Sequence, residues 1–216
     1  MALKRKNRKG IVFMGLGLLM MGAALSLTGY NLWDERRAEE ESNQVLEQLY
    51  LADEALAEPR TAGGRLEDIT GSAENVPDYV LNPDMPMPAV TVDGRQYIGV
   101  LTVPSLSLSL PVMSEWSYDN LKIAPCRYQG SAYKEDLIVA GHNYRKHFSP
   151  LKTLPIGAEI QFTDVDGNQF LYQVADLEVL DKMDVEEMET GDWDLTLFTC
   201  TYGGQTRFTV RCEEAR

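Results

Sequence analysis

The feature that most constrains the fold is an apolar stretch near the start of the chain. From Gly10 to Leu32, 23 residues carry no charged side chain and are rich in Leu, Met, Gly and Ala. A helix of about 20 apolar residues spans a bilayer and satisfies its own backbone hydrogen bonds there. Residues 10–32 are therefore expected to form a transmembrane anchor. A cleaved signal peptide, cut near Gly22–Ala24, is the alternative, although its apolar region is usually only about 7–15 residues long.

The charges on either side of this stretch predict its orientation. Asp34 and Glu35 follow it, whereas the nine residues before it contain five cations and no acidic side chain. Positive charge is retained on the cytoplasmic side of a membrane protein. Residues 1–9 are therefore expected in the cytoplasm and the rest of the chain outside it, in a protein that crosses the cell membrane once.

Beyond residue 9 the chain is strongly acidic. Residues 10–216 contain 15 of the 20 basic side chains and all 33 acidic ones, a net charge of −18, while the whole chain has a formal charge of −13. Such a surface repels phosphate backbones. Nucleic acid is therefore not an expected partner.

Two segments connect the anchor to the rest of the chain. Residues 33–57 are rich in charge, but Val45, Leu49, Ala52 and Leu56 recur at helical spacing. We expect a charged stalk helix and interpret it as a solvated spacer, with self-association or contact with the following domain as the alternative. Residues 58–88 contain five prolines and no clear period, which is typical of a flexible linker. Whether the end of this linker covers the domain as a lid is left open.

Residues 89–216 have the pattern of one mainly β domain. Leu106, Leu108, Leu110 and Val112 alternate with Ser or Pro, the period of a half-buried strand. The other expected strands are 97–103, 137–140, 159–163, 170–180, 195–201 and 207–212, and the turn 164–168 joins two of them as a hairpin. Seven or more short strands suggest a closed barrel or a sandwich with a few short helices.

Reactive side chains lie at the ends of two expected strands. His142 directly follows the apolar run 137–141, and Cys200 ends the run 195–200. Arg207 begins the next strand after a short loop that contains glycines, so a hairpin would bring it close to Cys200. The proximity of His142 does not follow from the spacing.

These three residue types fit nucleophilic catalysis. A thiol attacks carbonyls as its thiolate, and free cysteine is only about a few per cent ionised near neutral pH. An imidazole can take or return a proton, and a fixed guanidinium cation can stabilise an anionic tetrahedral intermediate. We therefore interpret Cys200 as the nucleophile, with His142 and Arg207 as its partners.

The remaining Cys, His and Arg candidates are not assigned a catalytic role, and the role of Cys126 is left open. Cys212 alternates with Arg207 and Arg211 along the last strand, so it is expected to be a buried thiol. A disulfide between Cys126 and Cys212 is left open as an alternative. His147 lies among Tyr, Arg and Lys residues and is expected in an exposed loop. Arg211 is interpreted as a surface charge, and Arg211→Ala is expected to spare the turnover that Arg207→Ala abolishes.

Taken in order along the chain, these motifs resemble the sortases, the extracellular cysteine transpeptidases of Gram-positive bacteria. Thr196–Cys200 (TLFTC) is similar to their TLxTC signature, His142 within AGHN matches their catalytic histidine, and Arg207 matches their essential arginine. Residues 98–104 and 110–112 resemble the opening strands of the family. The resemblance covers residues 97–212 and points to a housekeeping or class D-like enzyme.

The resemblance implies an eight-stranded β-barrel that cleaves an LPxTG-like sorting signal between Thr and Gly. Cys200 would form a thioester with the threonine carbonyl, and His142 would protonate the leaving amine. An amine of a peptidoglycan precursor or a pilin would then resolve the thioester. The substrates would be surface proteins with a C-terminal sorting signal, and Thr199 and Asn143 are expected to contribute to substrate binding.

Two other functions compete with transpeptidation. A hydrolytic cysteine peptidase would use the same three residues, and a non-enzymatic surface binding module would use none of them. No cofactor and no metal are expected. A calcium site stays open as an alternative, because some class A sortases bind calcium in the loop that here contains Asp184, Glu186, Glu187 and Glu189.

Overall fold

A computed structural model describes residues 8–52 and 76–215, which divide into two units with the boundary between Arg37 and Ala38. Helix α1 (Arg8–Ala52) is continuous and provides the whole described part of the first unit. Its apolar side chains there, among them Phe13 and Leu19, are exposed. Among the described residues, α1 is the one helix with the length and apolar composition needed to cross a membrane, which is consistent with a membrane anchor or a signal sequence.

The last turns of α1 belong to the second unit and pack against its β domain. Val45, Leu46 and Leu49 are buried in one cluster with residues of the domain: Val92, Tyr97, Val100, Met113, Ile123, Ala124 and Cys126. The Tyr50 hydroxyl also lies 2.8 Å from Ser109 Oγ. The interpretation of the stalk as a solvated spacer is therefore wrong for this part of the helix, because its apolar stripe is covered by the domain. Residues 53–57 of the expected stalk lie outside the described residues.

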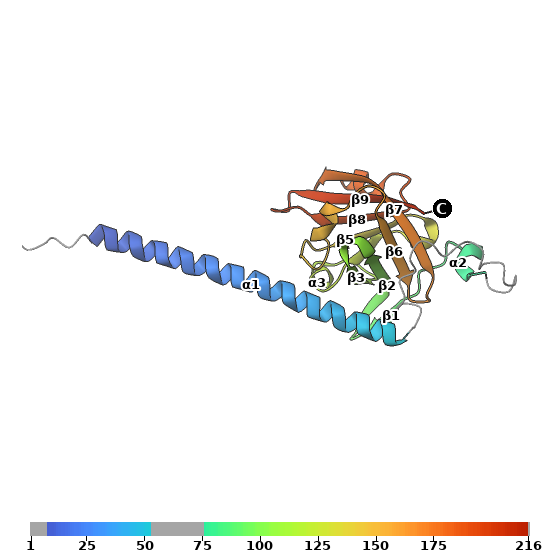
Figure 1. The fold of residues 1–216 in the computed structure, drawn as a ribbon, viewed down its shortest axis with the longest axis horizontal. Helices are drawn as coiled ribbons and strands as arrows, with labels where there is room; N and C mark the ends of the chain where they lie inside the picture. The colour runs from blue at the N-terminus through green and yellow to red at the C-terminus, as the bar shows by residue number, and fades with distance from the viewer. Residues whose placement is uncertain (1–7, 53–75, 216) are drawn as a thin grey trace, which may run out of the picture. The chain divides into compact units, whose positions relative to one another are not determined.

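The β domain is a closed barrel of eight strands with a ninth strand attached outside the ring (Figure 1). Strand β2 pairs with β3 on one side and with β6 on the other, which closes the ring, while β1 forms a hairpin with β2. The β3–β4 and β5–β8 pairs are parallel and the others antiparallel. The strands are β1 (Val90–Val92), β2 (Arg95–Val103), β3 (Leu108–Met113), β4 (Cys126–Gln129), β5 (Leu137–Gly141), β6 (Glu159–Asp164), β7 (Gln169–Asp181), β8 (Leu195–Cys200) and β9 (Thr206–Glu214).

Short helices fill the connections between strands. The α-helices are α2 (Asp78–Leu81), α3 (Tyr118–Leu121) and α4 (Val185–Glu189). The 3-10 helices are η3 (Pro104–Leu106), η4 (Ala132–Lys134) and η5 (Ser149–Thr153). The expected strand at 106–112 therefore begins two residues late, because Pro104 starts the turn η3 and Ser107 takes a left-handed conformation. The predictions did not include the short strands β1 and β4.

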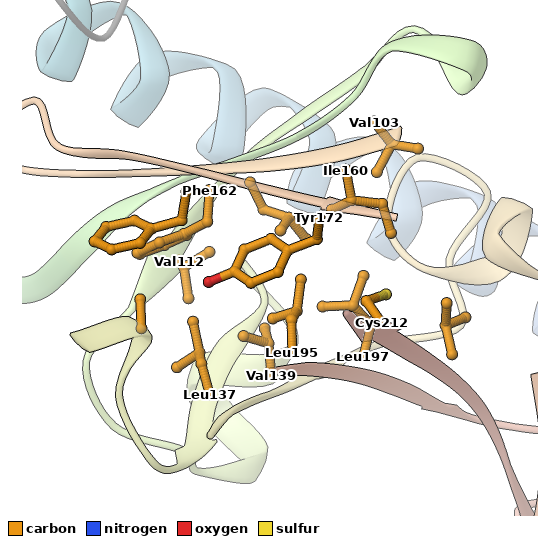
Figure 2. Packing of buried hydrophobic residues seen from close by; sticks show 14 of the residues in the cluster. Val103, Val112, Leu137, Val139, Ile160, Phe162, Tyr172, Leu195, Leu197 and Cys212 are labelled. Carbon is orange, nitrogen blue, oxygen red and sulfur yellow. The ribbon is translucent and has the colours of Figure 1, made fainter. Parts of the chain in front are cut away.

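The barrel interior is filled by inward-facing side chains of several strands. Figure 2 shows Leu195 and Leu197 of β8 close to Cys212 of β9, with Tyr172 of β7 in the same cluster. Val210 and Cys212 are fully buried in this core. The alternation predicted for the last strand is therefore confirmed for its apolar face, and the residues between these positions face away from the core.

The described end of the expected linker is packed against the barrel. Tyr79 stacks on Tyr133 with ring centroids 4.6 Å apart, and Met87 is buried in the main core. Tyr133 precedes β5, whereas His142 follows it. This segment therefore contacts the end of β5 opposite to His142. Residues 58–75 of the expected linker lie outside the described residues.

Candidate active site

The β8–β9 hairpin places Cys200 and Arg207 opposite each other. They are cross-strand partners in the antiparallel ladder, at the last position before the connecting loop. The loop is closed by hydrogen bonds from Thr201 N–H to the Thr206 carbonyl (3.0 Å) and from Gly204 N–H to the Thr201 carbonyl (2.9 Å). Gly203 and Gly204 both have positive φ, which glycine adopts without a steric penalty. The expected hairpin is thus present, and it pairs the two side chains.

The parallel pairing of β5 with β8 brings His142 to the same edge. Gly141, the last residue of β5, pairs with Thr199, so His142 directly follows β5 at the level where Cys200 ends β8. Neighbouring strands lie about 4.8 Å apart. Both side chains, like that of Arg207, are half-buried. The barrel therefore gathers the three predicted catalytic residues at one rim, and the sequence spacing alone could not show this for His142.

Local packing fixes the turn that follows His142. The Phe148 N–H donates to the His142 carbonyl (3.1 Å), which brings the Phe148 ring over Gly141. A Cβ atom at Gly141 would lie 2.3 Å from this ring. Glycine is therefore the residue that lets the loop fold back at the end of β5.

The ring of His142 belongs to an aromatic stack. It lies parallel to Tyr144, with centroids 3.7 Å apart, and Tyr144 meets His147 edge to face at 5.4 Å. The expectation that His147 lies in an exposed loop is wrong, because His147 is 0% exposed. Burial, together with the nearby His142, lowers the pKa of His147 to about 4. His147 is therefore neutral at physiological pH and sits beside the candidate active site.

The two arginines of β9 have different surroundings. Arg207 is half-buried and its Nη1 donates to the carbonyls of Gly204 and Thr206, each at 3.1 Å. Arg211 lies on the same face, but it is 2% exposed and forms an ion pair with Glu178 at 2.6 Å. The interpretation of Arg211 as a surface charge is therefore wrong. A charged group becomes buried when partners replace its water, and the sequence gives no sign of those partners.

The three cysteines are free thiols in different environments. Cys126 and Cys212 are each 0% exposed, and they lie in different apolar clusters. Burial raises the pKa of Cys126 to about 12 and raises the pKa of Cys212 further. The open alternative of a Cys126–Cys212 disulfide is not realised. Cys200 is the partly exposed thiol of the three.

A pocket of about 170 Å³ lies beside Arg207. Phe198 is part of its wall, and it shares the face of β8 with Cys200 because the two are two residues apart in one strand. Tyr128 meets Phe198 edge to face at 5.3 Å, and Trp116 meets Tyr128 at 6.1 Å. The remaining lining residues are Tyr118, Asp181, Lys182, Asp184, Val185, Met188 and Arg207. The predictions did not include this aromatic wall: Phe198 lies within the apolar run 195–200, and the one available signal for the rest of the wall was that Trp116, Tyr118 and Tyr128 are large aromatics outside the apolar runs.

The two residues expected to bind substrate differ in position. Thr199 is 5% exposed and alternates with Cys200, so its side chain lies on the core face with Leu195 and Leu197. The Thr199 side chain therefore does not share the face of β8 that carries Cys200, and the expected contribution of Thr199 to substrate binding stays a prediction. Asn143 is half-buried and directly follows His142.

The acidic residues of the β7–β8 connection are the candidate calcium ligands. In residues 8–52 and 76–215, no three His, Cys, Asp or Glu side chains come together in an arrangement that could hold a metal ion. Asp184 instead accepts a hydrogen bond from the Asp181 N–H at 3.1 Å. The calcium alternative therefore finds no support in the geometry of Asp184, Glu186, Glu187 and Glu189.

Comparison with known proteins identifies the family. The model of the sortase domain matches residues 101–215. A sortase A of Bacillus anthracis is 32% identical over 117 residues, which are 51% of this chain and 55% of that protein. The chain thus spans about half the length of this curated relative.

Solved structures share the fold. A sortase D5 transpeptidase of Clostridium perfringens aligns with a TM-score of 0.50 and 21% identity over 56% of this chain and 79% of that one. Sortase C1 of Streptococcus agalactiae aligns with a TM-score of 0.52 and 22% identity over 67% and 79%. These relatives carry the names of several subclasses, and none of them assigns one here. With its matched domain and its eight-stranded mixed barrel, the chain belongs to the sortase family.

Proposed function

We propose that this protein is a sortase-type transpeptidase that cleaves an LPxTG-like sorting signal between Thr and Gly. It then transfers the acyl group to an amine of a cell-wall precursor or of another protein. The observation that carries the proposal is the placement of His142, Cys200 and Arg207 at one rim of the barrel by the pairing of β5, β8 and β9. Membership of the sortase family supports the same reaction.

In the first step the Cys200 thiolate attacks the threonine carbonyl of the signal. The carbon–sulfur bond forms and the carbonyl oxygen becomes an anion. When the tetrahedral intermediate collapses, the peptide carbon–nitrogen bond breaks and the glycine nitrogen takes a proton from the His142 imidazolium. The products of this step are a thioester on Cys200, a neutral His142 and a released glycine amine.

In the second step an acceptor amine attacks the thioester. Neutral His142 accepts the proton that this amine loses, and the Cys200 thiolate leaves. The new amide bond joins the surface protein to its acceptor. The two proton transfers return the thiolate and the imidazolium to their starting states, so no cofactor is required by this scheme.

Arg207 is suited to stabilise the oxyanion of both steps. Its guanidinium is a fixed cation, and its position opposite Cys200 puts it beside the carbonyl under attack. The bonds from Nη1 to the Gly204 and Thr206 carbonyls use one of its two terminal nitrogens. The donors on Nε and Nη2 are therefore enough to bind a substrate carbonyl.

The pocket beside Arg207 offers a place for an apolar residue of the signal. Its aromatic walls Trp116, Tyr128 and Phe198 lie on the side of the β8–β9 hairpin that carries Cys200. An apolar side chain in such a pocket gains about 25 cal/mol for each Å² removed from water. We infer that this pocket contributes selectivity for the signal.

The proposed location is the cell membrane, with the amino terminus in the cytoplasm and the barrel outside. The uncharged residues 10–32 and the five cations among residues 1–9 support this orientation. The expected substrates are surface proteins that carry a C-terminal sorting signal, since these arrive at the outer face of the same membrane.

The reaction is tested by incubating the detergent-solubilised protein with a fluorescent LPxTG peptide, with and without an amine acceptor such as triglycine. A ligated product that appears only with the acceptor supports transpeptidation. Free acid alone at every acceptor concentration would establish a peptidase instead. A Cys200→Ala variant that retains the full activity of the parent would exclude catalysis through this thiol.

A further inference from the structure

Arg211 lies on the same face of the β8–β9 hairpin as Cys200 and Arg207. It is at the end of this face that the β7–β8 connection covers. Three successive cross-strand pairs occupy this face of the hairpin: Cys200 with Arg207, Phe198 with Thr209, and Thr196 with Arg211. The first pair is half-buried, whereas Arg211 is 2% exposed. The segment that covers Arg211 is the connection between β7 and β8, which contains helix α4.

The guanidinium of Arg211 ties this connection to the barrel. Its Nη2 donates to the Glu187 carbonyl at 2.6 Å, and its Nη1 donates to the Met188 carbonyl at 3.0 Å. On the barrel side, Nη1 donates to Thr196 Oγ1 at 3.0 Å and Nε donates to the Glu178 carboxylate at 2.6 Å. Arg211 therefore bonds to strand β7, strand β8 and helix α4 at once.

Helix α4 needs such a partner because of its length. It has five residues, and a helix this short is not stable without tertiary contacts. The last carbonyls of a helix lack partners within the helix, and a cation at this end complements the helix dipole. Arg211 supplies both hydrogen bonds and positive charge to the Glu187 and Met188 carbonyls. The planar fork of arginine suits two neighbouring carbonyls better than the single ammonium of lysine.

Helix α4 also forms one wall of the pocket beside Arg207. Val185 and Met188 line this pocket together with the aromatic residues, and the Met188 sulfur lies 4.0 Å from Thr209 Oγ1. Met188 therefore faces the pocket and accepts a hydrogen bond from Arg211 through its own carbonyl. A shift of α4 would change the width of the pocket without moving Cys200, His142 or Arg207, which lie on other elements.

We propose that Arg211 is a positioning residue that holds α4 as a wall of the sorting-signal pocket and thereby sets the affinity for the signal. The proposal rests on the proposed function, since the pocket is the one assigned to the signal there. Arg211 takes no part in the chemistry at Cys200. Glu178 accepts from Nε, whereas the bonds to α4 come from Nη1 and Nη2.

The test compares Arg211→Met with Glu178→Gln in the detergent-solubilised full chain. Methionine keeps an unbranched apolar side chain about as long as the stem of arginine but donates no hydrogen bond, whereas Glu178→Gln removes the carboxylate and leaves the donors of Arg211 that bond to α4. In Arg211→Met, amide hydrogen exchange in residues 182–192 should accelerate at least about tenfold, with the exchange of β5, β8 and β9 unchanged. In Glu178→Gln the exchange rate of the same residues should change less than about threefold.

Kinetics separate a positioning role from a catalytic one. Arg211→Met should raise KM for the signal peptide about tenfold and leave kcat within about threefold of the parent value. The rate of Cys200 alkylation by iodoacetamide, which needs no pocket, should stay within about twofold. Arg211→Lys retains the charge beside Glu178 and should show a KM between those of the parent and Arg211→Met. If Arg211→Met does not fold, the KM of Arg211→Lys tests the role of Arg211 instead.

Unchanged exchange in α4, or a loss in kcat with an unchanged KM, would overturn the proposal. A parent protein that processes no peptide would overturn the proposed function instead. In that case the exchange measurement would still decide whether Arg211 holds α4, because it requires no turnover.

Discussion

Cys200 and Arg207 face each other across the β8–β9 ladder, at the last pair before the loop that joins the two strands. Directly opposite residues of an antiparallel pair have Cβ atoms about 4.5–5.5 Å apart. If the proposed substrate carbonyl is bound at the thiol, it would be within reach of the guanidinium. This pairing makes the role of Arg207 open to a direct test.

Arg207→Ala is expected to lower kcat/KM for the signal peptide by about 10²- to 10³-fold, the usual effect of removing an oxyanion donor. Lys182→Ala is the matched control, because Lys182 lines the same pocket and is also a cation. Steady-state kinetics on both variants measure the difference. Equal losses in the two variants would mean that Arg207 contributes only to the general charge of the pocket.

Thiol labelling should distinguish Cys200 from the other two cysteines. Cys126 and Cys212 are fully buried and their pKa values are raised by burial, so they are both inaccessible and protonated. Brief treatment of the folded protein with iodoacetamide is expected to add one label, at Cys200, and treatment in urea should add three. Peptide mass spectrometry gives the positions, and early labelling of Cys212 would contradict the buried state described for it.

His147 should make the folded protein sensitive to acid. Its pKa is lowered to about 4 in the fold, against a usual value near 6.5. The unfolded chain therefore binds more protons between these values, and the stability due to neutral His147 is complete above about pH 6.5 and lost as the pH falls toward 4. The pKa difference corresponds to about 3 kcal/mol.

His147→Gln removes this titration. The free energy of unfolding of the variant, measured in urea, should fall about 2–3 kcal/mol less than that of the parent between pH 7 and pH 4.5. Lys152→Gln, an exposed change in the same loop, should follow the parent. Parallel curves for the parent and His147→Gln would show that folding does not lower the pKa of His147.

The end of α1 should stabilise the barrel. Leu49 is 1% exposed within the cluster that joins the helix to the domain, and replacing a buried leucine by alanine costs about 2–5 kcal/mol. Leu49→Ala is expected to lower the urea midpoint of barrel unfolding in the detergent-solubilised protein. Gln48→Ala, one residue earlier and exposed, is the control. If both variants unfold at the parent midpoint, the helix does not contribute to the stability of the domain.

The sequence by itself determined the features that depend on local pattern. An uncharged run of 23 residues predicted an apolar helix, and period-two alternation put Cys212 inside the barrel and Arg207 on the other face. Strand ends and a glycine loop predicted the pairing of Cys200 with Arg207. These features are encoded by neighbours in the chain, because side-chain direction alternates within a strand.

Only the tertiary structure decided the features that depend on distant partners. The β2–β6 pairing closes the barrel, and the register of β5 on β8 brings His142 level with Cys200. The burial of His147 and Arg211 contradicts their polar character, and Thr199 turns inward although it adjoins Cys200. Arg211 can be buried because Glu178, Thr196 and the α4 carbonyls replace its water. These partners are far from Arg211 in the sequence, so no local pattern contains them.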